Sequence, residues 1–174
     1  MELNIKNTMK RTTIKIGDIF VVKLEDYQKY FQYIADDMTM LNSSVIRSFI
    51  EKYPLGRTPI FNDVINGEVE FYAHTSLKLG VKMGLWEKVG NNPDTGSTGH
   101  ILFRRSKDYG HGSDGKRVEL SSRWEVWKIN EEFNYIGKLQ GESRKAEIGS
   151  VKPPNEIVER MKTGQYSYYY PGFE

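Results

Sequence analysis

The chain has 174 residues, of which 38% are hydrophobic and 28% charged, and its formal net charge is +2. This length and composition are typical of a globular chain that buries a core of its own. The near balance of 25 basic and 23 acidic residues argues against a dedicated nucleic-acid binder and against an acidic mimic of nucleic acid. Without cysteine, the chain has neither disulfides nor thiolate metal ligands.

Residues 1–11 are polar and are expected to form a flexible N-terminal arm, and residues 12–174 are expected to form a single α+β domain. The N-terminus has no apolar core of signal-peptide length. No stretch approaches the roughly 20 apolar residues that span a bilayer. We therefore expect a cytoplasmic protein without a membrane partner.

Two strands are predicted at the start of the domain, over residues 19–24 and 30–35. The first is apolar on both faces except at Lys23, which is typical of a strand that is covered on both sides. The second follows the polar break at Glu25 and Asp26 and places Phe31, Tyr33 and Ala35 on one face. Together they predict an antiparallel pair.

The middle of the chain contains several shorter patterns. Residues 45–50 are rich in β-branched side chains and favour a strand, with one short helix as the alternative. Residues 68–74 alternate between apolar and polar side chains, which predicts a half-buried strand. Residues 77–85 carry an apolar side chain at every second position and favour extended structure, although Gly80 and Gly84 weaken that pattern.

Two glycine-rich loops are predicted, over residues 90–99 and 104–117, on either side of a short strand at residues 101–103. Neither loop has the spacing of a phosphate-binding motif. Residues 118–129 and 135–139 then predict two further strands. Trp124 and Trp127 are three positions apart and face opposite sides of a strand, so both of its faces are expected to be covered.

The C-terminal part predicts the one helix of the chain, over residues 156–162, with Asn155 as its N-cap and Gly164 as its end. The expected fold is therefore predominantly antiparallel β-sheet, or a small curled barrel, with one C-terminal helix.

The tail after this helix is unusually aromatic. It folds back as an edge strand or faces a partner, and folding back is favoured because exposed aromatic patches are uncommon on monomers. Tyrosine nevertheless suits protein recognition, since it offers a large contact area at low entropic cost. The candidate partner-binding residues are the acidic pair after the second strand and four tail tyrosines: Asp36, Asp37, Tyr166, Tyr168, Tyr169 and Tyr170.

No catalytic, cofactor-binding or metal-binding residues are predicted. The three histidines, His74, His100 and His111, do not occur at metal-ligand spacing, and no GxSxG motif is present. One alternative is a metal-dependent hydrolase that uses His74 or His111. Another is a single-stranded nucleic-acid surface, for which the candidate residues are Tyr30, Phe31, Tyr33, Arg104, Arg105, Arg123 and Trp124.

The segments GDIFVVKL (residues 17–24) and KYFQYIA (residues 29–35) resemble immunity protein family twenty-six, which is also labelled HocA-like phosphotriesterase. The resemblance extends to FYAHTSLKLGVKMGLWEKVG, HILFR, RWEVWKIN and GESRKAEIG. It implies a cytoplasmic immunity protein, encoded beside a polymorphic or contact-dependent bacterial toxin, that binds this cognate toxin and occludes it. The phosphotriesterase label fits poorly, because the chain lacks the histidine-rich ligation that such hydrolysis uses.

Overall fold

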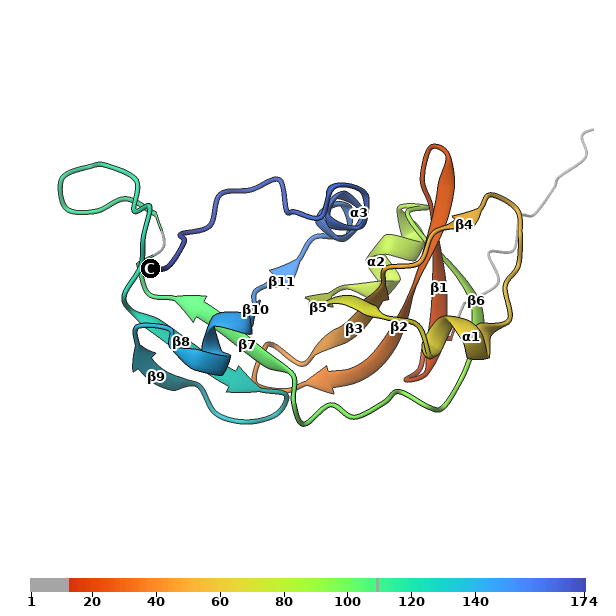
Figure 1. The fold of residues 1–174 in the computed structure, drawn as a ribbon, viewed down its shortest axis with the longest axis horizontal. Helices are drawn as coiled ribbons and strands as arrows, with labels where there is room; N and C mark the ends of the chain where they lie inside the picture. Colours follow the sequence, from red (N-terminus) through yellow and green to blue (C-terminus); the bar gives the residue numbers. More distant parts are fainter. Residues whose placement is uncertain (1–12, 109) are drawn as a thin grey trace, which may run out of the picture.

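The computed structural model describes residues 13–108 and 110–174, so the arm predicted over residues 1–11 lies outside the described part. The described chain forms a 7-stranded and a 4-stranded sheet side by side, with helices on the larger one (Figure 1). This confirms the α+β class and the predominance of antiparallel pairing. Two pairs, β11 with β5 and β10 with β7, are parallel, and the described strands form open sheets rather than a closed barrel.

The larger sheet has the strand order β11-β5-β3-β2-β1-β6, and β4 pairs with β2 beside this path. Its strands are β1 (Asp18–Lys23), β2 (Tyr27–Asp37), β3 (Ser43–Phe49), β4 (Tyr53–Pro54), β5 (Val69–Thr75), β6 (Glu87–Asn91) and β11 (Val151–Lys152). The predicted antiparallel pair is β1 and β2. Of residues 45–50, for which the sequence allows a strand or a short helix, residues 45–49 belong to β3 and Ile50 follows it.

The smaller sheet has the order β10-β7-β8-β9. Its strands are β7 (Leu102–Ser106), β8 (Trp124–Lys128), β9 (Asn134–Gly137) and β10 (Glu147–Ile148). The strand predicted over residues 118–129 is thus confirmed only in its second half. Trp124 and Trp127 are both buried and belong to different core clusters, which confirms that both faces of β8 are covered.

Three α-helices and one 3-10 helix complete the described chain. They are α1 (Phe61–Ile65), α2 (Leu77–Lys82), η1 (Gly141–Lys145) and α3 (Pro154–Thr163). Helix α3 confirms the predicted C-terminal helix and ends at Gly164, whose φ of 83° is easiest for glycine. Its N-cap position is occupied by Pro153 rather than by Asn155.

The prediction of extended structure over residues 77–85 is wrong, because these residues form α2 and the turn after it. A period of two places Leu77 and Leu79 on the same face, but in the helix Leu77 and the backbone at Gly80 face the core while Leu79 is exposed. A Cβ at Gly80 would lie 1.9 Å from the indole ring of Trp86. Gly80 therefore lets Trp86 pack directly on the helix, where its indole Nε1 donates to the carbonyl of Leu77.

The two faces of the larger sheet are covered differently. Helices α2 and α3 cover one face, where Ile157 and Met161 pack into the cluster around Phe20, Phe31 and Phe71. Burial of each such side chain stabilises the fold by about 2 kcal/mol. The other face packs against α1 in one region and against the smaller sheet in another, where β7 and β8 contribute Phe103 and Trp127.

A buried polar cluster joins the two sheets beneath this second region. The carboxylate of Asp37, at the end of β2, accepts hydrogen bonds from Nε2 of His74 on β5 at 2.8 Å and from Nε1 of Trp127 on β8 at 3.0 Å. Its other oxygen accepts from the backbone N–H groups of Asn130 and Thr39. Asp37 and His74 are fully buried, so this cluster binds strands of both sheets to one carboxylate.

The surroundings of Asp37 and His74 determine the charge of each side chain. Burial acts to raise the pKa of Asp37, but the hydrogen bonds from Asn130, Trp127 and His74 outweigh it and hold that pKa below its ordinary value. Burial lowers the pKa of His74 and outweighs the opposing effect of Asp37, while Lys152 adds to the lowering. Nδ1 of His74 is buried without a hydrogen-bond partner. A second ring proton would therefore have no acceptor, which fits a neutral imidazole that donates through Nε2.

Replacing Asp37 by alanine removes the acceptor shared by His74 and Trp127. We expect D37A to lower the free energy of unfolding by about 3 kcal/mol, because buried donors lose their partner. Urea denaturation followed by tryptophan fluorescence measures this change. The neighbouring D36A variant is the control, with a loss of about 1 kcal/mol for a single hydrogen bond. Equal losses in both variants would contradict the role given to Asp37.

The lowered pKa of His74 predicts a pH dependence. As the pH falls below 6.5, the ordinary value for histidine, the unfolded chain takes up a proton that folded His74 resists. The free energy of unfolding therefore decreases with falling pH, by at most about 1.4 kcal/mol per pH unit from this group. Urea denaturation between pH 7.5 and 5 should show a shallower slope for H74Q than for the wild type, whereas the exposed-loop control H111Q should keep it. A slope unchanged in H74Q would refute this account.

Candidate functional site

The C-terminal tail folds back over the molecule, as the sequence favoured, although it forms an irregular extended segment rather than an edge strand. Figure 1 shows this segment running from α3, above the larger sheet, to the smaller sheet, where the chain ends. Ser121 and Glu119 hydrogen-bond with the backbone of Gly172, and Ser106 donates its N–H to the hydroxyl of Tyr170 at 3.0 Å. The four candidate tyrosines are half-buried along this path.

Three of these four tyrosines come together around one cavity. Tyr166, Tyr168 and Tyr170 line a cavity of about 410 Å³ together with Arg104 of β7, Arg160 of α3, and Lys145 and Glu147 of the segment between them. We call it the tyrosine–arginine pocket. Tyr169 lies outside it, where its hydroxyl donates to the carbonyl of Val118 and its ring lies under Arg117.

The pocket exists because residues 147–152 pass from one sheet to the other. Glu147 and Ile148 pair with β7 of the smaller sheet, and Val151 and Lys152 pair with β5 of the larger sheet. Gly149 lies at the crossing, where a Cβ would be 2.1 Å from the indole of Trp127. This close approach lets the segment run directly over the junction of the sheets, and the tail then closes the pocket from the other side.

Arg160 and Glu147 form the best-defined ion pair of the pocket. Nη1 and Nη2 of Arg160 donate to the two carboxylate oxygens of Glu147 at 2.7 and 3.1 Å, a bidentate geometry. Nη1 also donates to the hydroxyl of Tyr166 at 3.0 Å. Burial raises the pKa of Tyr166 to about 12 and outweighs the opposing effect of Arg160, so this tyrosine is a neutral hydrogen-bonding group at physiological pH.

Arg104 is placed differently. Its guanidinium lies 4.9 Å from the ring centroid of Phe173 and 5.4 Å from that of Trp124, and Nη1 donates to the carbonyl of Ala146. Nε is buried without a hydrogen-bond partner. Among the residues that the structure describes, no carboxylate lies within ion-pair distance of Arg104. Burial lowers its pKa.

Lys152 lies behind the tyrosines with only 1% of its surface exposed. Its Nζ donates to the carbonyls of Ile148 and Ser150 and to the hydroxyl of Ser150, at 3.1, 2.7 and 2.7 Å. It also lies over the rings of Tyr166 and Tyr168. Burial, together with the charge of Arg160, lowers the pKa of Lys152 to about 7. The three oxygens match the three donors of an ammonium group, which fits the charged form below that pH.

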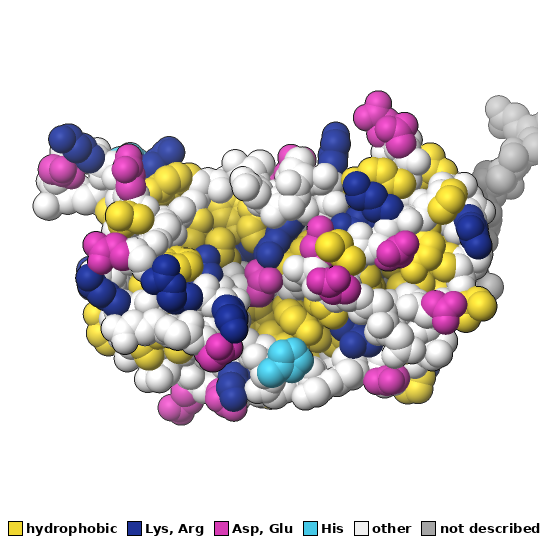
Figure 2. Space-filling model, in the orientation of Figure 1, with side chains coloured by type: hydrophobic (Ala, Val, Ile, Leu, Met, Phe, Trp, Pro, Cys, Tyr) yellow, Lys and Arg dark blue, Asp and Glu magenta, His cyan; other side chains and the backbone are white. Residues whose placement is uncertain are grey.

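A second cavity adjoins the first and shares Lys145 and Glu147 with it. This cavity of about 460 Å³ lies between β5 and β7, and we call it the apolar hollow after the side chains of Val69, Phe71, Tyr72, Ile101 and Leu102 that line it. His100 and the charged residues Glu70, Lys128 and Glu142 complete its lining. The His100 ring packs edge-on against Tyr72. Figure 2 shows apolar side chains in the middle of this face of the molecule, with basic and acidic side chains between and around them.

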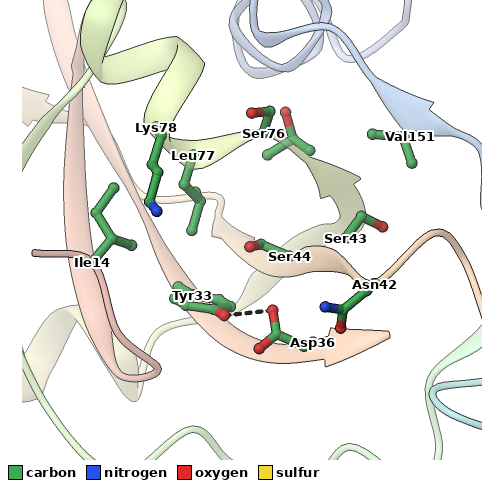
Figure 3. A pocket seen from close by; sticks show the side chains of 11 residues that line it. Ile14, Tyr33, Asp36, Asn42, Ser43, Ser44, Ser76, Leu77, Lys78 and Val151 are labelled. Carbon is green, nitrogen blue, oxygen red and sulfur yellow. Dashed lines mark hydrogen bonds between the residues drawn. The ribbon is translucent and has the colours of Figure 1, made fainter. Parts of the chain in front are cut away.

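Asp36 lies in a different cavity, of about 420 Å³, on the side of the sheet that carries α2 (Figure 3). Its Oδ1 accepts a hydrogen bond of 2.5 Å from the hydroxyl of Tyr33, and Lys78 extends from α2 toward the same space. Burial raises the pKa of Tyr33 to about 12, and the hydrogen bond to Asp36 adds to this effect. Asp37, by contrast, is fully buried in the cluster with His74, so its carboxylate holds strands together instead of facing a partner.

The residues of the two alternative sites, a histidine-based metal site and a nucleic-acid surface, do not come together in the structure. His74 is buried, whereas His100 and His111 lie in separate exposed regions. In residues 13–108 and 110–174, no group of three or more His, Asp or Glu side chains is placed to hold a metal ion. Of the proposed nucleic-acid surface, Tyr30, Phe31, Tyr33 and Trp124 are buried in the core.

Comparisons of the chain with protein-family models, with curated proteins and with solved structures find no significant match. The resemblance to immunity protein family twenty-six therefore stays a prediction. None of the described helices is long and apolar enough to cross a bilayer.

Lys145, Glu147, Lys152 and Arg160 were missed by sequence reasoning, which named Arg104 only for a nucleic-acid surface. These residues follow no local motif, because they come from η1, β10, β11 and α3 and meet only through the crossing of the chain between the sheets. Glu147 and Arg160 are 13 positions apart, a spacing that by itself does not indicate an ion pair.

The environment of Lys152 predicts a second pH dependence. Its pKa is lowered from 10.5 to about 7, so between these values the unfolded chain binds a proton that the folded chain has released. The free energy of unfolding should therefore rise with pH above about 7, by at most about 1.4 kcal/mol per pH unit from this group. Urea denaturation at pH 7, 8 and 9 should show this rise in the wild type and in the exposed control K145M, and a smaller rise in K152M. An equal rise in all three proteins would contradict the lowered pKa of Lys152.

Proposed function

We propose that the chain is an immunity protein, which binds a cognate bacterial toxin in the cytoplasm and blocks it by occlusion. The observation that carries the proposal is the gathering of three candidate tyrosines and two arginines around one cavity, which adjoins an apolar hollow. Tyrosine and arginine are enriched at protein interfaces and among their energetic hot spots. The resemblance at residues 17–35 supports the same function.

The layout of this face also supports a protein as the partner. The tyrosine–arginine pocket and the apolar hollow share the wall formed by Lys145 and Glu147. A partner covering both cavities would bury aromatic and apolar groups at the centre and charged groups at the rim. Such an arrangement is typical of specific interfaces, whereas its affinity depends on a few anchoring groups rather than on total area.

The direct test is co-expression of the chain with the product of the neighbouring toxin gene. We expect one-to-one capture in a pull-down and rescue of growth in an intoxication assay. Absence of both capture and rescue with that product would overturn the proposal.

Charge reversal tests the location of the interface with a matched pair of lysines. Lys145, at the pocket, and Lys23, on β1, are both exposed, and each pairs with an exposed glutamate, Glu142 and Glu87. We expect K145E to weaken toxin binding about tenfold, or about 1.4 kcal/mol, because a charge at the rim of the interface is reversed. K23E should bind like the wild type. Equal effects of the two variants in a calorimetric titration would exclude this face as the contact surface.

A further inference from the structure

We infer that the tyrosine–arginine pocket receives the carboxylate of an acidic residue from the bound protein, and that Arg104 is the principal partner of this carboxylate. This inference rests on the proposed function and specifies the chemistry of the same face. It starts from a difference between Arg104 and the other cations that line the pocket.

Each of the other lining cations already has a carboxylate. Arg160 is held by both oxygens of Glu147, and Lys145 donates to Glu142 at 2.8 Å. Arg104 has only the carbonyl of Ala146 as a hydrogen-bond acceptor within the described chain, and its buried Nε has none. Glu147 attracts Arg104 electrostatically without forming an ion pair with it, and the rings of Trp124 and Phe173 lie near its guanidinium. Arg104 therefore lines the pocket without a hydrogen-bonded carboxylate in the described chain, and part of the cost of its desolvation stays uncompensated.

Below about pH 7, the charges around the pocket also sum to an excess of positive charge. Lys152 is then in its charged form and interacts electrostatically with Arg160 and Arg104, and with Glu147 and Glu156, which makes three cations against two carboxylates. Glu156 is itself held by the backbone N–H and the hydroxyl of Ser167 at 2.8 and 2.5 Å. One further negative charge would balance this group, and a single carboxylate supplies it.

The neighbouring hollow identifies the source of this carboxylate. A free anion would occupy only the tyrosine–arginine pocket, but this pocket adjoins the apolar hollow, which lies on the other side of the wall formed by Lys145 and Glu147. An acidic side chain next to an apolar one fits the two cavities together. A protein surface presents this combination. Because the side chain that binds at Arg104 must be negatively charged, we assign it to an aspartate or a glutamate.

The test uses glutamate capped as N-acetyl-glutamate N-methylamide, titrated into the full chain at constant ionic strength and followed by NMR. We expect a saturable shift of the Arg104 Nε–H signal with a dissociation constant on the order of 10 mM, since a single charge-assisted contact supplies a small free energy. Capped glutamine should give at least tenfold weaker binding. The readout at Arg104 itself in the wild-type protein does not depend on a variant that folds.

Two variants refine this test. R104Q should bind capped glutamate at least tenfold more weakly, whereas R117Q should bind it like the wild type, because Arg117 stacks on Tyr169 outside the pocket. Near-ultraviolet circular dichroism checks that both variants keep the packing of their aromatic side chains. Undiminished binding by folded R104Q, or the absence of a saturable shift in the wild type, would overturn the inference.

Inorganic phosphate, titrated in the same way, separates the sources of the anion. Binding of phosphate at least tenfold tighter than that of capped glutamate would identify a free-phosphate site and overturn the assignment to a protein side chain. The outcomes are distinct from those of toxin capture. A chain that captures the toxin but ignores capped glutamate refutes the inference alone, and a chain that binds capped glutamate but captures no toxin refutes the proposed function.

Discussion

The fold depends on the carboxylate of Asp37, which binds His74 of the larger sheet and Trp127 of the smaller sheet at one buried point. Apolar packing alone leaves the relative position of two sheets loosely defined, because it has no direction. A buried carboxylate with donors from three elements allows few arrangements, since any displacement leaves a charged group without its partners. The crossing segment at residues 147–152 and the returning tail rely on this fixed position of the sheets.

The proposed binding face follows from that junction. Strands β10 and β11 belong to different sheets although only two residues separate them. The chain therefore crosses from one sheet to the other here, and strand pairing does not cover the junction between the sheets, which we call the seam. The tail covers part of this seam with Tyr166, Tyr168 and Tyr170 and leaves the two adjoining cavities. Aromatic side chains held in place by the fold lose little conformational freedom on binding, which favours tight association with a protein.

Much of the fold follows from local patterns in the sequence. The alternation around Phe31 and Tyr33 and the glycine after α3 identify their elements, because period and capping act over a few neighbouring residues. Helix α2 could not be predicted from a local pattern. Its Gly80 weakens a helical pattern, and the reason for this glycine is Trp86, which lies beyond the end of the helix and packs on it. The acidic pair after the second strand predicts Asp37 as a partner-binding residue, yet Asp37 is buried with His74 and Trp127, which are 37 and 90 residues away in the sequence. The pocket was missed for a similar reason, because Arg104 of β7 lies about 40 residues before the other residues that line it, which lie between positions 145 and 170.

The central claim is that a protein partner covers the face formed by the tyrosine–arginine pocket and the apolar hollow. Hydrogen–deuterium exchange of the chain, free and in complex with the captured toxin, tests this claim most directly, because it reports on every backbone amide without a substitution. We predict that protection on binding concentrates in residues 141–148 and 164–170. Protection confined to another surface, such as the edge strand β6 or the loop at residues 110–118, would contradict the account.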